Sequence, residues 1–265
     1  MEQCIYTQFK NEIIFIILFI LEMWKKDKLY DIINLNVPNG YKEFFKRNDV
    51  DRMLKNISDS LFERAKHCEI YPKITDVFRA LKTKNPRVLI LGQDPYHNPD
   101  KKDSSLPGSA VGLCFSLPPN QTEINPSFRS IQKEIVNCGF TSSGTGDISR
   151  WASDGVILLN SALTVEKSDA GSHTVLWSKF MEELISFIST ERCIGWLLWG
   201  RDAQSYESSI KRVEDQFIIK SSHPMPLSAN KSSGGNPPFF GNAGFNQVND
   251  WLEDCGKEKI DWSIP

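Results

Sequence analysis

The chain has 265 residues, a formal net charge of −2 and a sequence pI of about 6.1. Because 40% of the residues are hydrophobic and 11% are aromatic, the chain can bury a substantial core, and one domain is the simplest expectation. This charge balance gives no evidence of nucleic-acid binding, so any such contact must be local.

The amino-terminal segment is unusually apolar. The run Ile13–Leu21 is too short to span a bilayer and is flanked by Glu12 and Glu22. It lacks the basic leader and cleavage site of a secretory signal and the arginines of a mitochondrial presequence. We therefore expect residues 1–25 to be an extension, packed as a helix or poorly ordered, before a single domain over residues 26–265, with no membrane association.

Four apolar runs predict buried strands. Branched and apolar residues in succession are typical of strands covered on both faces, as in parallel sheets. Between two of the runs, apolar residues from Trp177 to Ile188 fall at helical spacing, with Ser172 or Ser178 as a cap. Residues 147–154 predict a short helix closed by Gly155. The strand runs are Val88–Leu91, Val156–Leu159, Cys193–Trp199 and Phe217–Ile219.

This alternation predicts an α/β fold with a central, mainly parallel four-stranded sheet flanked by helices and joined by right-handed crossovers. Six cysteines show no CxxC pair and no regular spacing, which argues against zinc, iron–sulfur clusters and disulfides. We therefore expect no metal, no cofactor and a reducing compartment. The cysteines are Cys4, Cys68, Cys114, Cys138, Cys193 and Cys255.

Polar side chains follow the predicted strands at their carboxyl ends. The sequence Gly92-Gln-Asp-Pro-Tyr-His97 follows the first, Asn160 the second, and His223-Pro224 comes soon after the fourth. Ligands of open parallel sheets bind outside the carboxyl ends of the strands. A turn in which Asp94 caps a helix would explain one of these residues, but the whole set predicts a catalytic site.

Five motifs, in order, resemble those of the uracil-DNA glycosylases of the family 1 type. The resemblance runs from about Asp27 to Trp262 and implies that family's three-layer sandwich and the excision of uracil from DNA, without metal. The motifs are Gly92-Gln-Asp-Pro-Tyr-His97, Gly112-Leu-Cys-Phe-Ser116, Leu158-Leu-Asn160, Leu198-Trp-Gly200 and His223-Pro-Met-Pro-Leu-Ser228.

The resemblance further implies a virus protein of the gamma-herpesvirus group, located in the host nucleus, because residues 230–238 extend the segment after Leu227. We expect a monomer that acts on uracil-containing DNA, single- or double-stranded. A partner in the replication machinery and a proteinaceous inhibitor of the glycosylase are also expected. The composition of residues 229–238 is that of a flexible loop, and we expect it to follow the DNA backbone.

The resemblance gives four residues to the uracil pocket. Phe115 is the surface on which the flipped base stacks, and Tyr96 excludes the methyl group of thymine. The amide of Asn160 offers one donor and one acceptor to uracil O4 and N3–H, which mismatches the amino group of cytosine. Gln93 completes the pocket, largely through its backbone.

Cleavage of the N-glycosidic bond places positive charge on the sugar and negative charge on the departing base. The carboxylate of Asp94 suits the first charge and can orient the attacking water. His223 suits the second by donating a hydrogen bond to uracil O2, and the resemblance implies a neutral imidazole. His97 is expected to shape the water pocket, with a structural histidine as the alternative.

DNA contacts are expected from two loops and the start of one helix. Leu227 matches the apolar wedge that fills the space of the extruded base. Met225 stands where the family usually has serine, and Arg201 replaces a neutral phosphate contact with a charged one. The expected DNA-binding residues are Pro126, Ser127, Arg201, Ser222, Pro224, Met225, Pro226, Leu227, Ser228 and Lys231.

Rival interpretations have less support. A metal hydrolase using Asp94, His97 and His223 would need a further ligand at a recognisable spacing. A serine hydrolase would need a Gly-x-Ser-x-Gly elbow, which is absent from the sequence. The remaining alternative is a viral replication accessory that uses the same fold as a scaffold. Intact Asp94, Asn160 and His223 favour the enzyme.

Overall fold

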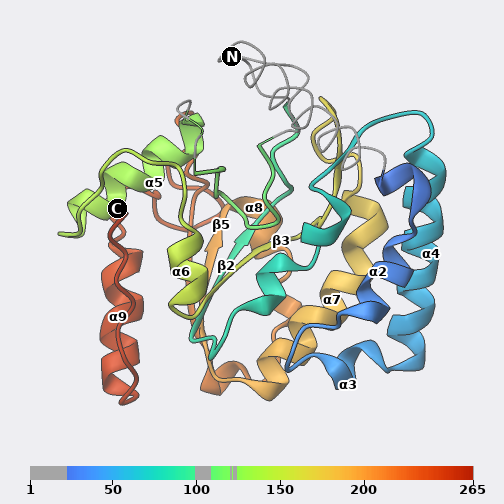
Figure 1. The fold of residues 1–265 in the computed structure, drawn as a ribbon. Coiled ribbons are helices and arrows are strands. Elements are labelled where there is room, and N and C mark those ends of the chain that lie inside the picture. Colours follow the sequence, from blue (N-terminus) through green and yellow to red (C-terminus); the bar gives the residue numbers. More distant parts are fainter. Residues whose placement is uncertain (1–22, 99–108, 120, 122–123, 265) are drawn as a thin grey trace, which may run out of the picture.

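The structure is a computed structural model that describes residues 23–98, 109–119, 121 and 124–264 (Figure 1). Its centre is a four-stranded sheet of order β3-β2-β5-β6 in which every pairing is parallel. The predicted α/β fold is therefore confirmed. The strands are β2 Val88–Gly92, β3 Val156–Asn160, β5 Gly195–Trp199 and β6 Phe217–Ser221.

The sheet register brings the polar strand ends together. Every residue of β2, β3 and β5 is buried, as expected from their uninterrupted apolar sequences. Gly92 at the end of β2 lies opposite Asn160 at the end of β3. The carboxyl ends of all four strands therefore meet at one edge of the sheet, and the site is built there.

Helices cover both faces of the sheet. In Figure 1, α2, α4 and α7 lie on one side and α5, α6 and α9 on the other, which gives the three-layer sandwich. A short antiparallel pair, β1 Ile70–Tyr71 with β4 Val165–Glu166, stands apart from the main sheet. The α-helices from Leu29 onward are α2 Leu29–Leu35, α3 Lys42–Phe45, α4 Asn48–Arg64, α5 Pro126–Asn137, α6 Ser149–Ser153, α7 Thr174–Glu191, α8 Gly200–Gln204 and α9 Gly244–Asp254.

The two helices predicted from spacing are present. The short helix α6 is followed by Gly155 at a φ of +89°, the left-handed conformation expected of a closing glycine. The predicted caps of α7 are wrong: the residue before the helix is His173, and no side chain caps it. Ser172 Oγ instead accepts a hydrogen bond from the N–H of Glu166, because the chain turns back before the helix begins.

One continuous core runs from Trp24 to Ile264. Trp24, which the sequence placed in the amino-terminal extension, is 4% exposed, and its Nε1 donates to Pro72 O. The apolar run Ile13–Leu21 and most of the loop before Ala110 lie outside the described residues. None of the helices in the described part of the chain is long and apolar enough to cross a membrane.

Candidate active site

A cavity of about 200 Å³ opens at the carboxyl edge of the sheet. The structure brings into its wall all seven residues expected to bind uracil or act on it, although they come from four segments of the chain. Backbone turns after β2, β3 and β6 supply most of them. These residues are Gln93, Asp94, Tyr96, His97, Phe115, Asn160 and His223.

The aromatic surface expected under the base is Phe115. Its φ is +61°, a left-handed conformation that is uncommon for an aromatic residue and needs support from its surroundings. The hydroxyl of Tyr96 donates to Phe115 O at 3.0 Å, and the ring of Trp199 lies 5.4 Å away, centroid to centroid. The ring centroid of His223 is 6.2 Å from that of Phe115.

Close packing of β2 against β3 fixes the amide of Asn160, which is 6% exposed. A Cβ on Gly92 would lie 2.5 Å from Asn160 Oδ1, so only glycine leaves room for this side chain. The carbonyl of Gln93 accepts hydrogen bonds from Ala162 N at 2.9 Å and Ser161 Oγ at 2.8 Å. The backbone of Gln93 is thus fixed to the chain that follows Asn160.

Asp94 combines a partly buried carboxylate with a short hydrogen bond. Its Oδ2 accepts from Gly171 N at 2.6 Å. Burial raises the pKa of Asp94 above its ordinary value, and it outweighs the Gly171 N–H and the nearby His97, which favour the charged form. The carboxylate is therefore poorly solvated, which strengthens its interaction with any positive charge that forms beside it.

The backbone determines the tautomer of His223. The N–H of Met225 donates to His223 Nδ1 at 3.0 Å, so Nδ1 is an acceptor and the proton of the neutral ring is on Nε2. Burial lowers the pKa of His223 below its ordinary value, against the opposing charge of Asp202. The neutral imidazole implied by the resemblance agrees with this arrangement, and Nε2–H is left as the donor.

His97 lines the cavity from the turn that follows β2. Its Nδ1 is buried and has no hydrogen-bond partner among the described residues. Its carbonyl accepts from Ser168 N at 2.8 Å, which holds the turn after β2 to the segment before α7.

Residues 223–228 form a compact turn that presents Leu227 to solvent. The side chain of Leu227 is 77% exposed and that of Met225 is 48% exposed. The hydroxyl of Ser228 donates to His223 O at 2.9 Å, and Ala229 N donates to Met225 O at 2.9 Å. The turn is closed by its own hydrogen bonds, so the exposed Leu227 is held outward before any ligand arrives.

Ser222 is a correction to the expected DNA contacts. It is 1% exposed, and its hydroxyl donates to Ser228 O and accepts from Phe239 N. Its N–H donates to Pro237 O. Because these groups are used inside the protein, Ser222 holds the turn in place and does not reach a phosphate. Pro224 is buried as well.

The remaining expected DNA contacts lie at the surface or at the cavity rim. Pro126 occupies the first turn of α5, where Asn125 Oδ1 accepts from Ser127 N at 2.9 Å. Both Asn125 and Ser127 line the cavity. The start of α5 therefore presents N–H groups beside the site, which favours anions. Arg201, Pro226 and Lys231 are exposed.

The loop over residues 229–238 is more regular than its composition predicts. Ser233 and Asn236 exchange backbone hydrogen bonds of 3.1 and 3.0 Å around Gly234 and Gly235, whose φ angles are +59° and +80°. Both angles belong to a tight hairpin turn that glycine favours. Asn236 Nδ2 also donates to Gln204 Oε1 at 3.0 Å. These hydrogen bonds give residues 233–236 a defined hairpin turn that the composition did not predict.

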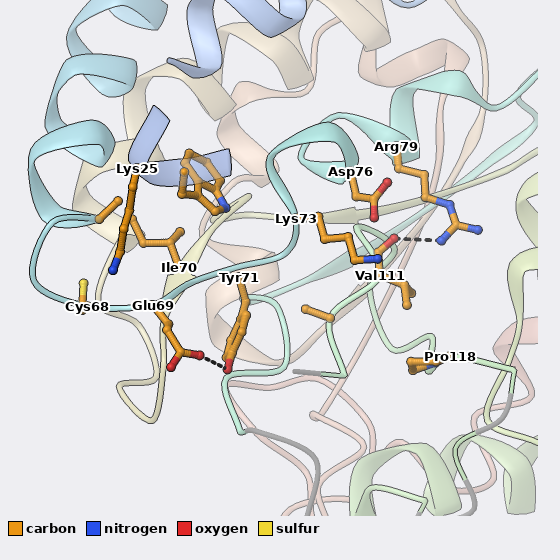
Figure 2. A pocket seen from close by; sticks show the side chains of 13 residues that line it. Lys25, Cys68, Glu69, Ile70, Tyr71, Lys73, Asp76, Arg79, Val111 and Pro118 are labelled. Carbon is orange, nitrogen blue, oxygen red and sulfur yellow. Dashed lines mark hydrogen bonds between the residues drawn. The ribbon is translucent and has the colours of Figure 1, made fainter. Parts of the chain in front are cut away.

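A second cavity of about 330 Å³ lies behind one wall of the site and shares Ala110 and Val111 with it. Figure 2 shows Arg79 reaching Val111, whose carbonyl accepts from Arg79 Nη1 at 3.0 Å. None of the seven residues named above lines this cavity. Although it is the larger of the two, it lacks the paired carboxylate and imidazole of the smaller one.

The sequence motifs did not identify two residues that affect Asp94. Gly171 donates to Asp94 from 77 positions further along the chain. Asp202 in α8 is an exposed acidic residue whose charge opposes the charged form of Asp94 and favours that of His223. A local motif identifies neither residue, because both depend on how the segments after β4 and β5 fold back toward the site.

Comparison with known proteins agrees with the fold. Residues 78–253 match the model of the uracil DNA glycosylase superfamily. A uracil-DNA glycosylase of Pseudomonas aeruginosa is 40% identical over 239 residues, covering 87% of this chain and 96% of its own. A uracil-DNA glycosylase of Bacillus mycoides is 36% identical over 217 residues, covering 80% and 89%.

The crystal structure of mimivirus uracil-DNA glycosylase superposes with a TM-score of 0.80 at 24% identity and covers 91% of each chain. Variants of that mimivirus protein have been solved in complex with UGI. The chain belongs to the uracil-DNA glycosylase family. These relatives by sequence are bacterial, so nothing in them supports the herpesvirus origin expected from the length of the loop.

Proposed function

We propose that this chain acts as a DNA-repair glycosylase that rotates uracil out of DNA and hydrolyses its N-glycosidic bond, releasing free uracil and leaving an abasic site. The observation that carries this proposal is the convergence of Asp94, Asn160 and His223 in one cavity at the carboxyl edge of the sheet. A base within a duplex cannot reach such a cavity unless it leaves the stack.

Recognition of uracil is assigned to Asn160, Phe115 and Tyr96. The buried amide of Asn160 pairs with O4 and N3–H, and a cytosine in its place would leave buried polar groups unpaired at a cost of about 1–3 kcal/mol each. Phe115 supports the face of the base, and the ring of Tyr96 limits space at its C5 edge. Both aromatic residues line the cavity.

Cleavage is assigned to two residues that stabilise opposite charges on the two sides of the scissile bond, the positive charge on the sugar and the negative charge on the departing base. The carboxylate of Asp94 stabilises the cationic sugar and orients the water that attacks it, while His97 helps to hold that water. Neutral His223 donates its Nε2–H to uracil O2 as negative charge accumulates there. The Met225 N–H on Nδ1 supports this role, because it keeps the donor on Nε2.

DNA binding is assigned to the exposed turn and its neighbours. Leu227 enters the space left by the base. Ser127 supplies a hydroxyl group, and Arg201 and Lys231 supply positive charge for phosphates, contacts that fix position without reading sequence. With a net charge of −2, the protein depends on such local contacts.

The experiment is release of free uracil from a uracil-containing oligonucleotide, single- and double-stranded, in the presence of a chelator. We expect release with both substrates and none with thymine or cytosine in place of uracil. Asp94→Asn is the matched control, because it keeps the size of the side chain. Absence of release by folded protein, or equal release by the control, would overturn the proposal.

We also propose that a proteinaceous inhibitor competes with DNA for the turn that carries Leu227. Support comes from the mimivirus complexes with UGI, which share this fold, and from the exposed apolar side chains of Met225 and Leu227. The test is titration of the uracil-release assay with UGI. Full activity at a molar excess of UGI would overturn this proposal.

A further inference from the structure

The carboxylate of Asp94 depends on an N–H group from a distant segment. Gly171 lies between β4 and α7, and its N–H donates to Asp94 Oδ2 at 2.6 Å. This hydrogen bond favours the charged form of the carboxyl group, against the effect of burial. Gly171 has a φ of +77°, so the direction of its N–H depends on a backbone conformation that the neighbouring residues must maintain.

Backbone hydrogen bonds close the segment into a compact turn. Glu166 O accepts from Asp169 N at 3.1 Å, and Gly171 O accepts from Thr174 N at 3.0 Å. Across the turn, Glu166 N donates to Ser172 Oγ at 2.8 Å. Residues on both sides of Gly171 are therefore attached to Glu166, which is the last residue of β4.

A chain of polar side chains lies beneath this turn. His173 is completely buried, with Nδ1 at 2.8 Å from Thr164 Oγ1 and Nε2 at 3.4 Å from Glu166 Oε1. Thr164 Oγ1 also accepts from Trp177 Nε1 at 2.7 Å. His173 Nε2 faces the carboxylate of Glu166 at 3.4 Å without making a hydrogen bond among the described residues.

Charge complements this geometry. Burial opposes the charged form of Glu166, but Arg64 and His173 outweigh it and lower the pKa of Glu166. Arg64 Nη1 lies 2.6 Å from Glu166 Oε1. Burial lowers the pKa of His173, which favours the neutral ring. Cys68 is the other titratable group that faces Glu166, and the carboxylate raises its pKa.

We propose that Glu166 and His173 are positioning residues for the reaction: together they hold the turn at residues 167–172 so that Gly171 N–H remains on the Asp94 carboxylate. Neither residue lines the cavity. Each acts through the backbone between them, and Arg64 fixes Glu166 from the end of α4. Only the expected effect of these residues on uracil release rests on the proposed function.

The first test follows the amide proton of Gly171 by NMR and needs no DNA. In the parent protein its chemical shift should titrate with Asp94, and in Asp94→Asn that titration should vanish. In Glu166→Ala we expect the titration midpoint to move to higher pH by about 0.5–1 unit, because a donor to the charged carboxylate is weakened. Faster exchange of this amide with solvent should accompany the shift.

The matched control is Glu183→Ala. Glu183 is a residue of α7 that pairs with Arg47 at 2.6 Å, the same distance as the Glu166–Arg64 pair, and it does not touch the turn. This variant should leave the Gly171 amide unchanged. Glu166→Gln should restore much of the parental behaviour, since its amide oxygen still accepts from Arg64 Nη1.

Uracil release provides the kinetic test. Glu166→Ala should lower kcat about tenfold at neutral pH with KM nearly unchanged, and the acidic limb of its pH profile should move to higher pH. An unshifted Gly171 titration in folded Glu166→Ala, or the same shift in the control, would overturn the proposal whether or not uracil is released. If Glu166→Ala does not fold, Ser172→Ala provides the test, because it removes one attachment of the turn. This variant should shift the Gly171 titration in the same direction by a smaller amount. No shift in Ser172→Ala would overturn the proposal equally.

Discussion

The hydroxyl of Tyr96 holds the backbone of Phe115, with 3.0 Å between Tyr96 Oη and Phe115 O. Burial raises the pKa of Tyr96, so the hydroxyl stays protonated and remains a donor. Phe115 needs this support because its φ of +61° is rarely adopted by an aromatic residue. A residue expected only to exclude thymine therefore also fixes the surface under the base.

The two roles of Tyr96 can be separated by substitution. Tyr96→Phe keeps the ring but leaves the carbonyl of Phe115 without its donor, a loss of about 1–3 kcal/mol. We expect roughly tenfold slower uracil release with thymine still excluded. Tyr96→Ala should admit thymine as well. These outcomes are measured as kcat/KM on matched oligonucleotides. A phenylalanine variant with parental kinetics would show that the hydrogen bond does not support Phe115.

The pH dependence should follow the raised pKa of Asp94 and the lowered pKa of His223. Protonation of Asp94 removes its negative charge, so activity should fall as pH decreases through a pKa above the ordinary carboxyl value. Because the pKa of His223 is lowered, the ring is still neutral at a pH equal to the ordinary pKa of histidine. Activity should therefore not decline as the pH falls through that ordinary value. Asp94→Asn should keep the fold and DNA binding, lose orders of magnitude in kcat and lack the Asp94 limb. Near-parental turnover by folded Asp94→Asn would contradict the mechanism.

Specificity should depend on the amide of Asn160. In Asn160→Asp the donor is replaced by an acceptor or by a protonated hydroxyl, so discrimination against cytosine should relax while uracil release slows. The measurement is release of each base from otherwise identical oligonucleotides. Parental rate and selectivity in this variant would place Asn160 outside the pocket.

Leu227→Ala should separate the wedge from a general binding contact. We expect activity on duplex DNA to fall on the order of tenfold, and less on single strands, because only a duplex has a vacated stack to fill. Leu35, which is 85% exposed in α2, offers a matched control in Leu35→Ala. Equal losses on the two substrates would indicate a defect in folding or in general binding.

The loop at residues 229–238 should add little affinity. Replacing it with a short linker is expected to raise KM for duplex DNA modestly and to flatten its salt dependence, because Lys231 is removed. Lys231→Ala alone should reproduce the change in salt slope. An unchanged KM and slope in a shortened protein of normal stability would exclude the loop from DNA binding.

The sheet was predictable because its strands are buried. Runs such as Val88–Leu91 and Val156–Leu159 have no polar residue that water could solvate, so their sequence defines both the strand and its end. The position of Asp94 and Asn160 follows from those ends. The same local information is missing for Gly171, whose contact with Asp94 depends on a turn closed by side chains from elsewhere in the chain.

Burial explains the predictions that failed. Ser222 has the composition of a surface loop residue, and only the fold reveals that the chain from residue 237 to 239 covers it. The caps of α7 were wrong because Ser172 bonds to Glu166 across a tertiary contact. In each case the polar group had several partners available, and long-range packing selected one.

The side chain of Gln204 attaches the loop after Leu227 to the central sheet, and this attachment affects the entropy of DNA binding. Its Nε2 donates to Leu198 O and Ser221 O at the ends of β5 and β6, while its Oε1 accepts from Asn236. One side chain thus joins the hairpin turn to the sheet, and the loop loses its conformational entropy when the protein folds. Association with DNA then begins from a surface that already has its shape, so little further ordering should oppose binding, and the association rate should depend mainly on salt and diffusion.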